Sequence, residues 1–388
     1  MGMNAIPFKD LKPDSYFSEA VYLDEDYILI TPEVPLSSAM LSKLAEWEFR
    51  EVLTSGEVLE HREQPEAYPD EQDDSSTEVS QISSHSADDK ETLEKVAAIY
   101  GQFVKYTDSV FNRYVTKEEL NLKEISDKIK SMLDNLNEYK RYILRLLNSP
   151  SVSSNYLVNH AARSTILSMV IGSHIKLPPH RLIELGVAAL LHEIGMIRLP
   201  SQLYMVGRKL SENERKSITA HPILSYNILK DRKFPLSISL AALEHHERVN
   251  GSGYPRGLTG DKISLYAKIL AVACSYDAVT ASRPYKEARE GYTGIMDILK
   301  NEGKKYDDTI IKALVYSLSL YPIGTYVLLS NGKVGQVIDT NPENPRMPIV
   351  RVLGSKTPDG KEIIVNTSEQ GIHVQEPVKR EDAEKLIT

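Results

Sequence analysis

The chain has 388 residues, which is too long for one ordinary hydrophobic core and predicts two or three domains. Its formal net charge of −8 argues against broad nonspecific binding to nucleic acid, and we expect no DNA partner. A single cysteine, Cys274, excludes an internal disulfide. The sequence shows neither an apolar run long enough to span a bilayer nor a signal peptide, so we expect a cytoplasmic protein.

The first 57 residues predict a small α/β module. Residues 20–23 and 27–31 are β-rich and flank a polar turn, which favours a hairpin. Residues 37–49 repeat apolar side chains at helical spacing, and residues 50–54 are typical of a short strand. Trp47 is interpreted as a core residue of this module.

The next two segments differ sharply in composition. Residues 58–89 are acidic and rich in serine, which predicts a disordered linker. Residues 90–148 predict a helical hairpin or stalk, and Thr116 with Glu119 resembles a capping box between its helices. Because its apolar seam is not a strict heptad repeat, packing onto the next domain is favoured over a dimer stalk, although a homodimer stays open.

The rest of the chain divides into a helical part and a β part. Residues 149–320 predict a mainly helical domain, with one helix that begins at Ser211 and carries His221 near its end. Residues 321–376 alternate with a period of two and predict a small, barrel-like β module, followed by an exposed charged tail at 377–388. The predicted fold class is therefore a multidomain, mainly α protein.

The side chains that can carry chemistry gather in the helical domain. Five of the ten histidines lie there in a pattern with a neighbouring carboxylate, Glu193: His160, His192, His221, His245 and His246. One such histidine is more often a core residue, but five together favour a metal site. Two adjacent cations can activate a bound water and clamp the oxygens of a phosphoryl group. Arg283 and Lys286 are suited to bind phosphate.

A long ordered motif gives a more specific expectation. The run HHERVNGSGYPRGLTGDKISLYAKILAVA, followed by YDAVTASRPYK, resembles the HD-GYP family, a branch of the HD metal-dependent phosphohydrolases. The resemblance covers about residues 150–320. It implies an all-α catalytic domain, two or three iron or manganese ions, and hydrolysis of cyclic di-GMP to pGpG and then GMP.

The resemblance also implies roles for single residues. It assigns metal ligation to the five histidines and Glu193, and catalytic roles to Glu193 and Asp277. Asp277, Arg283 and Lys286 match residues on the substrate side of the family's site. The GYP signature, expected to bind substrate, is Gly253-Tyr254-Pro255.

Four positions depart from the family pattern. Tyr156 stands where members with three metals carry a glutamate ligand, so we expect two divalent ions, iron first, with manganese or zinc as alternatives. Glu193 replaces an aspartate that bridges the metals. Met196 replaces a lysine that would stabilise phosphate. Cys274 replaces an aspartate ligand, and it is either a thiolate ligand or a small buried hydrophobe.

Two functional hypotheses follow. The first is a divergent phosphodiesterase that hydrolyses cyclic di-GMP slowly, because its active site is partly substituted. The second is a catalytically inactive cyclic di-GMP receptor or an adaptor for a signalling partner such as a diguanylate cyclase. Retention of all five histidines and of the GYP loop favours the first hypothesis.

Overall fold

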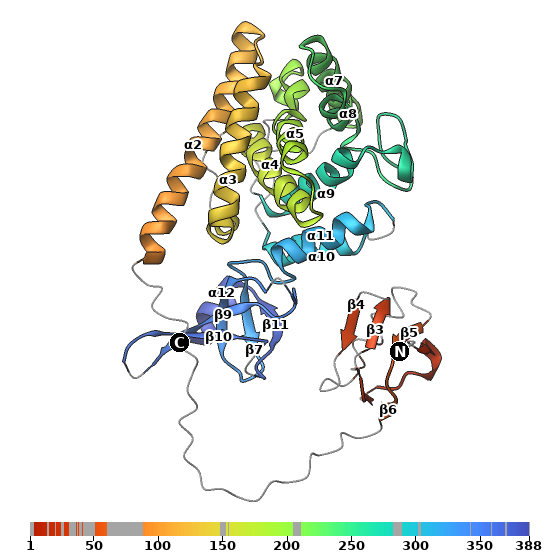
Figure 1. Cartoon of the computed structure of the whole chain (residues 1–388), viewed down its shortest axis with the longest axis vertical. Coiled ribbons are helices and arrows are strands. Elements are labelled where there is room, and N and C mark those ends of the chain that lie inside the picture. The colour runs from red at the N-terminus through yellow and green to blue at the C-terminus, as the bar shows by residue number, and fades with distance from the viewer. Residues whose placement is uncertain are drawn as a thin grey trace, which may run out of the picture. The chain divides into compact units, whose positions relative to one another are not determined.

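The chain forms two compact units, Met1–Ser80 and Gln81–Thr388, which are described separately. The structure is a computed structural model (Figure 1). It describes residues 4–13, 15–19, 21–24, 27–30, 36, 38, 41, 51–59, 88–147, 153, 155–204, 211–281, 289–301, 304–341, 343–357, 359–368 and 371–387. The predicted linker at 58–89 falls outside these residues, except for its two ends.

The N-terminal unit contains a four-stranded antiparallel sheet in the order β1-β5-β3-β4. The predicted hairpin is confirmed as the β3–β4 pair, and the predicted strand at 50–54 is β5. Of the predicted helix at 37–49, only Ser38 and Leu41 are among the described residues, and both are helical, whereas Trp47 lies outside the described residues. The strands are β1 (Asn4–Pro7), β2 (Tyr16–Phe17), β3 (Val21–Asp24), β4 (Tyr27–Ile30), β5 (Glu51–Thr54) and β6 (Val58–Leu59), and β2 pairs with β6.

Two long helices, α2 (Asp88–Lys117) and α3 (Leu122–Leu147), open the second unit. Their apolar faces share one core with the helices that follow, so packing rather than a free stalk is confirmed (Figure 1). The predicted capping box is wrong. Thr116 lies inside α2, where its hydroxyl donates to the Asn112 carbonyl, and Asn121 instead accepts the Glu124 amide at the start of α3.

The helical domain surrounds two helices that are buried on nearly every side, α4 and α9. Most of their buried residues are apolar, but each helix also buries polar side chains, such as His160 and Arg163 in α4 and Asp277 in α9. The helices are α4 (Tyr156–His174), α5 (Pro179–Leu191), α6 (Glu212–Ile218), α7 (His221–Asp231), α8 (Leu236–Glu244), α9 (Leu265–Thr280), α10 (Gly291–Leu299) and α11 (Asp308–Leu318). Among the described helices of the chain, none is long and apolar enough to cross a membrane.

His221 lies at a helix start, not near a helix end. The predicted helix start at Ser211 is confirmed, where Ser211 and Glu214 form a capping box, but α6 stops at Ile218. His221 then begins α7, with Pro222 in its first turn, where a proline costs no hydrogen bond. The prediction that one helix carries both Ser211 and His221 was therefore wrong.

The C-terminal β module is a five-stranded antiparallel sheet in the order β10-β9-β8-β7-β11. The predicted tail is ordered, because β11 pairs with β7 and is followed by α12 (Arg380–Ile387). Residues 379–382 are exposed as expected, whereas Ala383 is fully buried. The strands are β7 (Tyr326–Leu329), β8 (Val334–Asp339), β9 (Ile349–Lys356), β10 (Glu362–Asn366) and β11 (Val374–Val378).

Candidate metal centre

The predicted ligands come from separate segments and meet in the middle of the helical domain. They form two groups in which the possible ligand atoms lie within 4.8 Å of one another. The outer group is Glu193, His221, His245 and His246, and the inner group is His160, His192 and Cys274. The segments are the second turn of α4, the end of α5, the start of α7, the end of α8 and the middle of α9.

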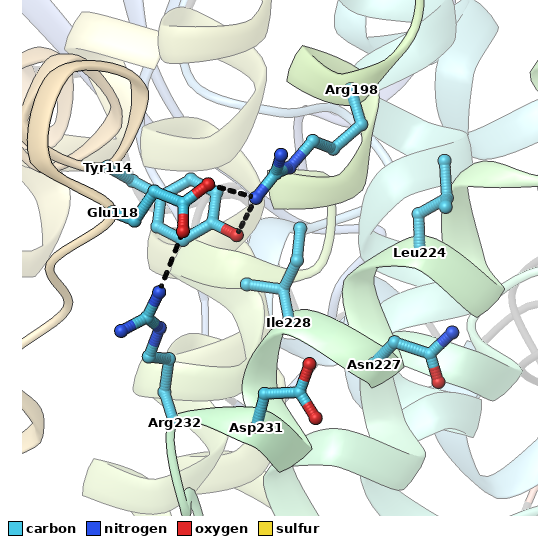
Figure 2. Close-up of a pocket in the computed structure, with 8 residues that line it drawn as sticks. All are labelled: Tyr114, Glu118, Arg198, Leu224, Asn227, Ile228, Asp231 and Arg232. Carbon is cyan, nitrogen blue, oxygen red and sulfur yellow. Dashed lines mark hydrogen bonds and ion pairs between the residues drawn. The ribbon is translucent and has the colours of Figure 1, made fainter.

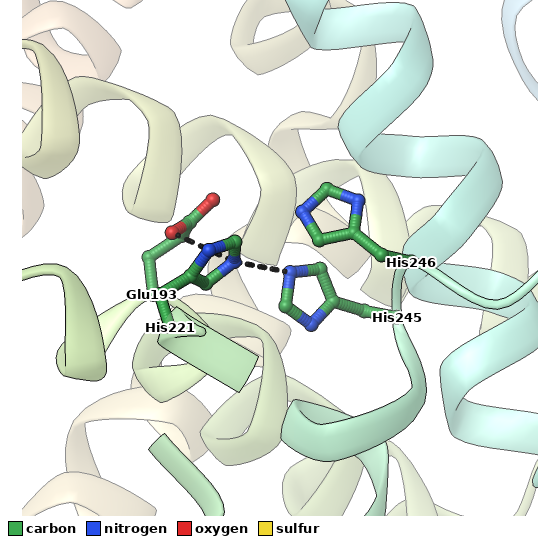
Figure 3. A group of neighbouring side chains, drawn as sticks. All are labelled: Glu193, His221, His245 and His246. Atoms are coloured by element: carbon green, nitrogen blue, oxygen red, sulfur yellow. Dashed lines mark hydrogen bonds and ion pairs between the residues drawn. The ribbon is translucent and has the colours of Figure 1, made fainter. Parts of the chain in front are cut away.

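In the outer group, three imidazoles face one carboxylate (Figure 3). The Nε2 atoms of His221 and His245 lie 3.2 Å apart. Glu193 Oε2 lies 3.3 Å from His221 Nε2. The His246 ring packs on the His245 ring, with centroids 4.1 Å apart. Such a set of nitrogen and oxygen donors suits a divalent transition metal.

In the inner group, a thiol lies between two imidazoles. Cys274 Sγ is 3.3 Å from His192 Nε2, and the ring centroids of His160 and His192 are 5.3 Å apart. All three side chains are buried. Cys274 therefore does not lie in the purely apolar surroundings expected of a small hydrophobe.

Glu193 joins the two groups. Its Oε1 lies 4.0 Å from the Nε2 atoms of both His160 and His192, while its Oε2 faces His221. Oε2 is buried and has no hydrogen-bond partner among the described residues. Burial raises the pKa of Glu193, but the surrounding imidazoles outweigh burial and lower it to about 2. The longer side chain thus still spans both groups as a carboxylate.

Four of the five imidazoles are oriented by a hydrogen bond on the far side of the ring. The Nδ1 atoms donate at 2.6–2.8 Å: His160 to Asp277, His192 to the Ala189 carbonyl, His221 to the Ile218 carbonyl and His245 to the Ala242 carbonyl. This arrangement fixes the tautomer and directs each Nε2 lone pair inward, as is usual for histidines that bind metal.

Comparison with known proteins agrees with this geometry. Residues 147–310 match the family model described as "HD domain". On this similarity, we refer to residues 147–310 as the HD domain. The resemblance to the HD-GYP family that the motifs predicted is confirmed by the matched relatives.

Three relatives illustrate the likeness. "Cyclic di-GMP phosphodiesterase PdeB" of Borreliella burgdorferi is 30% identical, over 54% of this chain and 55% of that protein. "Cyclic di-GMP phosphodiesterase PA4108" of Pseudomonas aeruginosa is 31% identical, over 55% and 52%. "3'3'-cGAMP-specific phosphodiesterase 3" of Vibrio cholerae is 31% identical, over 44% and 37%. The alignments thus span about half the length of the first two relatives, and less of the third.

Asp277 occupies a different place in the HD domain from the one predicted. It is fully buried behind His160, and its second oxygen accepts from Arg163 Nε. Arg163 is also buried and donates to the Leu147 carbonyl at the end of α3. Burial raises the pKa of Asp277, but Arg163 and His160 lower it to about 2. Asp277 is therefore placed to orient a ligand rather than to touch substrate. Sequence reasoning missed Arg163, which lies one helical turn after His160.

The GYP loop of the HD domain covers the outer group. The Tyr254 ring stacks on the His246 ring, with centroids 4.7 Å apart and planes 20° apart. Gly253 has no room for a side chain, because an added Cβ would lie 2.4 Å from the Arg248 nitrogen. Pro255 follows Tyr254 through a cis peptide bond. The loop thus brings an aromatic side chain to the open side of the centre.

A buried carboxylate that sequence reasoning missed holds this loop in place. Glu247 is 1% exposed, and its two oxygens accept the backbone amides of Arg256 and Leu258 at 2.7 and 2.9 Å. Its position directly after His245 and His246 was the available signal. Glu247 therefore positions the loop without contacting the ligand atoms.

A buried hydroxyl fastens the turn after Glu193 to α7. Ser225 donates to the His192 carbonyl at 2.7 Å and accepts the Gly195 amide at 2.9 Å. A Cβ at Gly195 would lie 2.4 Å from the His221 carbonyl oxygen. The segments that carry His192 and His221 are thus locked together, and nothing in the sequence pattern singled out Ser225.

The remaining predicted site residues add no atom to the two ligand groups or lie outside the described residues. Met196 is buried in an apolar cluster that includes Phe111 and Ile228. Tyr156 stacks on the His160 ring at 5.6 Å. Arg283 and Lys286 lie outside the described residues, so their substrate roles stay predictions.

A cavity of about 330 Å³, which none of the site histidines line, lies between the end of α2 and the HD domain (Figure 2). Glu118, at the end of α2, binds Arg198 at 2.7 Å and Arg232 at 3.1 Å. Tyr114 accepts a hydrogen bond from Arg198 at 3.0 Å. Because both arginines already pair with a carboxylate, the cavity has no excess of cationic groups for an anion.

Proposed function

We propose that the chain is a metal-dependent phosphodiesterase that hydrolyses cyclic di-GMP to pGpG and GMP. The observation that carries this proposal is the pair of ligand groups that share Glu193, with their imidazole Nε2 atoms directed inward. Names of relatives that specify cyclic di-GMP support the choice of substrate.

The donor set fits two divalent cations, and iron is the first candidate because nitrogen, carboxylate and thiolate donors all suit it. When bound, such a pair supplies an activated water and neutralises charge on phosphate oxygens. Glu193 stays ionised and offers one oxygen to each group. Asp277 and the three anchoring carbonyls hold the proton of each ring at Nδ1 and turn Nε2 toward the centre.

Tyr254 is assigned to the nucleotide. Burial raises the pKa of its phenol, so the hydroxyl stays protonated and can donate a hydrogen bond to phosphate or base. Glu247 and Gly253 keep the loop close to His246. We further propose that Arg283 and Lys286 bind the phosphates, as the sequence motif implies.

A direct assay tests the proposal. The protein, loaded anaerobically with iron or manganese, is incubated with cyclic di-GMP, and products are separated by chromatography. We expect slow formation of pGpG and GMP, which His221→Ala abolishes because it removes an outer ligand. No turnover by the fully loaded protein would contradict the proposal. Parallel assays with 3'3'-cGAMP decide between the two substrates named for the relatives.

A second candidate function is a receptor or adaptor that binds cyclic di-GMP without cleaving it. It is favoured by Met196, which fills an apolar cluster where the family pattern has a cation. Nucleotide binding measured by calorimetry on the metal-loaded protein, without product formation, would support this function. Loss of nucleotide binding in Tyr254→Ala would show that the nucleotide binds at the GYP loop.

A further inference from the structure

The two ligand groups differ in donor chemistry. The outer group offers three imidazoles and a carboxylate oxygen, whereas the inner group offers two imidazoles and a thiol. We propose that the inner group is a distinct soft-metal position, in which Cys274 Sγ binds a thiophilic divalent cation such as zinc. Manganese and magnesium, which prefer oxygen donors, are then confined to the outer group. This inference rests on the metal centre of the proposed function.

The inner distances suit a small tetrahedral cation. Zinc bonds of about 2.0–2.3 Å place neighbouring ligand atoms roughly 3.3–3.8 Å apart. Cys274 Sγ and His192 Nε2 are 3.3 Å apart. Glu193 Oε1, at 4.0 Å from the Nε2 atoms of His160 and His192, supplies the fourth donor. A small contraction around an ion completes the tetrahedron.

Independent features point to a ligand here, beyond the cysteine itself. Glu193 is only 8% exposed, and its Oε1 faces the Nε2 atoms of both inner imidazoles, while its Oε2 faces His221 of the outer group. Both inner imidazoles are anchored at Nδ1, by Asp277 and by the Ala189 carbonyl. Their Nε2 atoms are thereby turned toward the thiol and the carboxylate, which is the orientation that a shared cation requires.

The inner position is also the more enclosed of the two. His160, His192 and Cys274 are 4%, 0% and 8% exposed, whereas His246 in the outer group is only partly buried beneath Tyr254. A cation in the inner group is therefore expected to exchange slowly, and one in the outer group to exchange with solvent.

Cobalt titration of the metal-free full-length protein tests the assignment. A thiolate bound to cobalt gives a near-ultraviolet charge-transfer band, which imidazole and carboxylate ligands do not give. When two equivalents of cobalt are added to the wild-type protein, we expect this band to reach its full intensity after the first equivalent. Cys274→Ser should lose the band, and His246→Ala, which alters the outer group, should keep it.

A variant with an oxygen donor in place of the thiol provides a second test. Cys274→Asp supplies an oxygen donor in the same place, so it should bind two cobalt ions without the band and should gain a second manganese ion. Circular dichroism checks that each variant is folded. If wild-type protein binds two cobalt ions without the band, Cys274 is not a ligand and the inference is wrong, while the metal centre stands. If it binds no metal, the proposed function fails as well.

Discussion

The carboxylate of Asp277 shows how one buried residue ties stability to pH. Its pKa is lowered from 3.8 to about 2, because Arg163 and His160 favour the charged form. Between pH 3.8 and about pH 2, Asp277 is therefore protonated more often in the unfolded chain than in the folded one. The free energy of unfolding falls as the pH falls through this range. The shift corresponds to about 2 kcal/mol, and this contribution is complete above about pH 4–5.

We predict that Asp277→Asn destabilises the protein by about 3–5 kcal/mol at neutral pH, because it leaves Arg163 buried and unpaired. The difference in unfolding free energy between wild type and variant should shrink as pH falls from about 4 toward 2, where Asp277 itself is protonated. Urea denaturation at several pH values measures it. A difference that stays constant across this range would contradict the assigned pair.

Met196 gives a second prediction for a single residue. Restoring the family's lysine by Met196→Lys places an ammonium group among buried apolar side chains, and we expect a loss of about 3–5 kcal/mol. Met196→Leu conserves volume and should cost less than about 1.5 kcal/mol. Thermal unfolding of both variants makes the comparison. If Met196→Lys is as stable as the leucine variant, the lysine has reached the metal cavity or solvent.

The identity of the histidine ligands could be predicted from the sequence, because their motif is long and ordered. The part played by Asp277 could not, because it depends on how α4 packs beside α9 and on Arg163 approaching from the same side. Cys274 stayed ambiguous for the same reason. A thiol becomes a candidate ligand only when packing brings two imidazole nitrogens to its sulfur.

At the scale of elements, several predictions depended on where a helix begins and ends. Pro222 was the available signal that a helix starts at His221, since proline fits the first turn and disrupts a later one. The tail after β11 reads as charged, yet its helix buries one alanine against the β module. A single small contact of this kind leaves no periodic apolar pattern in the sequence.

The GYP loop yields a prediction at this scale. Glu247→Gln replaces one acceptor oxygen with an NH₂ group that faces a backbone amide, at a cost of about 1–3 kcal/mol. We expect faster hydrogen exchange at the amides of Arg256 and Leu258, and a higher KM for the nucleotide. Asp261→Asn, an exposed change in the same loop, is the matched control. If hydrogen exchange at these two amides is unchanged in Glu247→Gln, then Glu247 does not position the loop.

For the whole molecule, the two units should respond differently to metal. A cation that binds only folded protein stabilises it by about 2.7 kcal/mol at a hundredfold excess over Kd. Chelation should therefore lower the melting temperature seen by circular dichroism, which reports the helical unit. Trp47 is the chain's one tryptophan and belongs to the N-terminal unit, so its fluorescence transition should not move. Parallel shifts of both signals would show that the units unfold together.

The anchored imidazoles have one more consequence. With Nδ1 of His221 and of His245 both donating outward, their Nε2 lone pairs face each other across 3.2 Å with no hydrogen between them. Two acceptors at this distance repel, and only a proton or a cation placed between them makes the contact favourable. A divalent cation that binds both Nε2 atoms therefore gains from the removal of this repulsion as well as from the bonds that it forms.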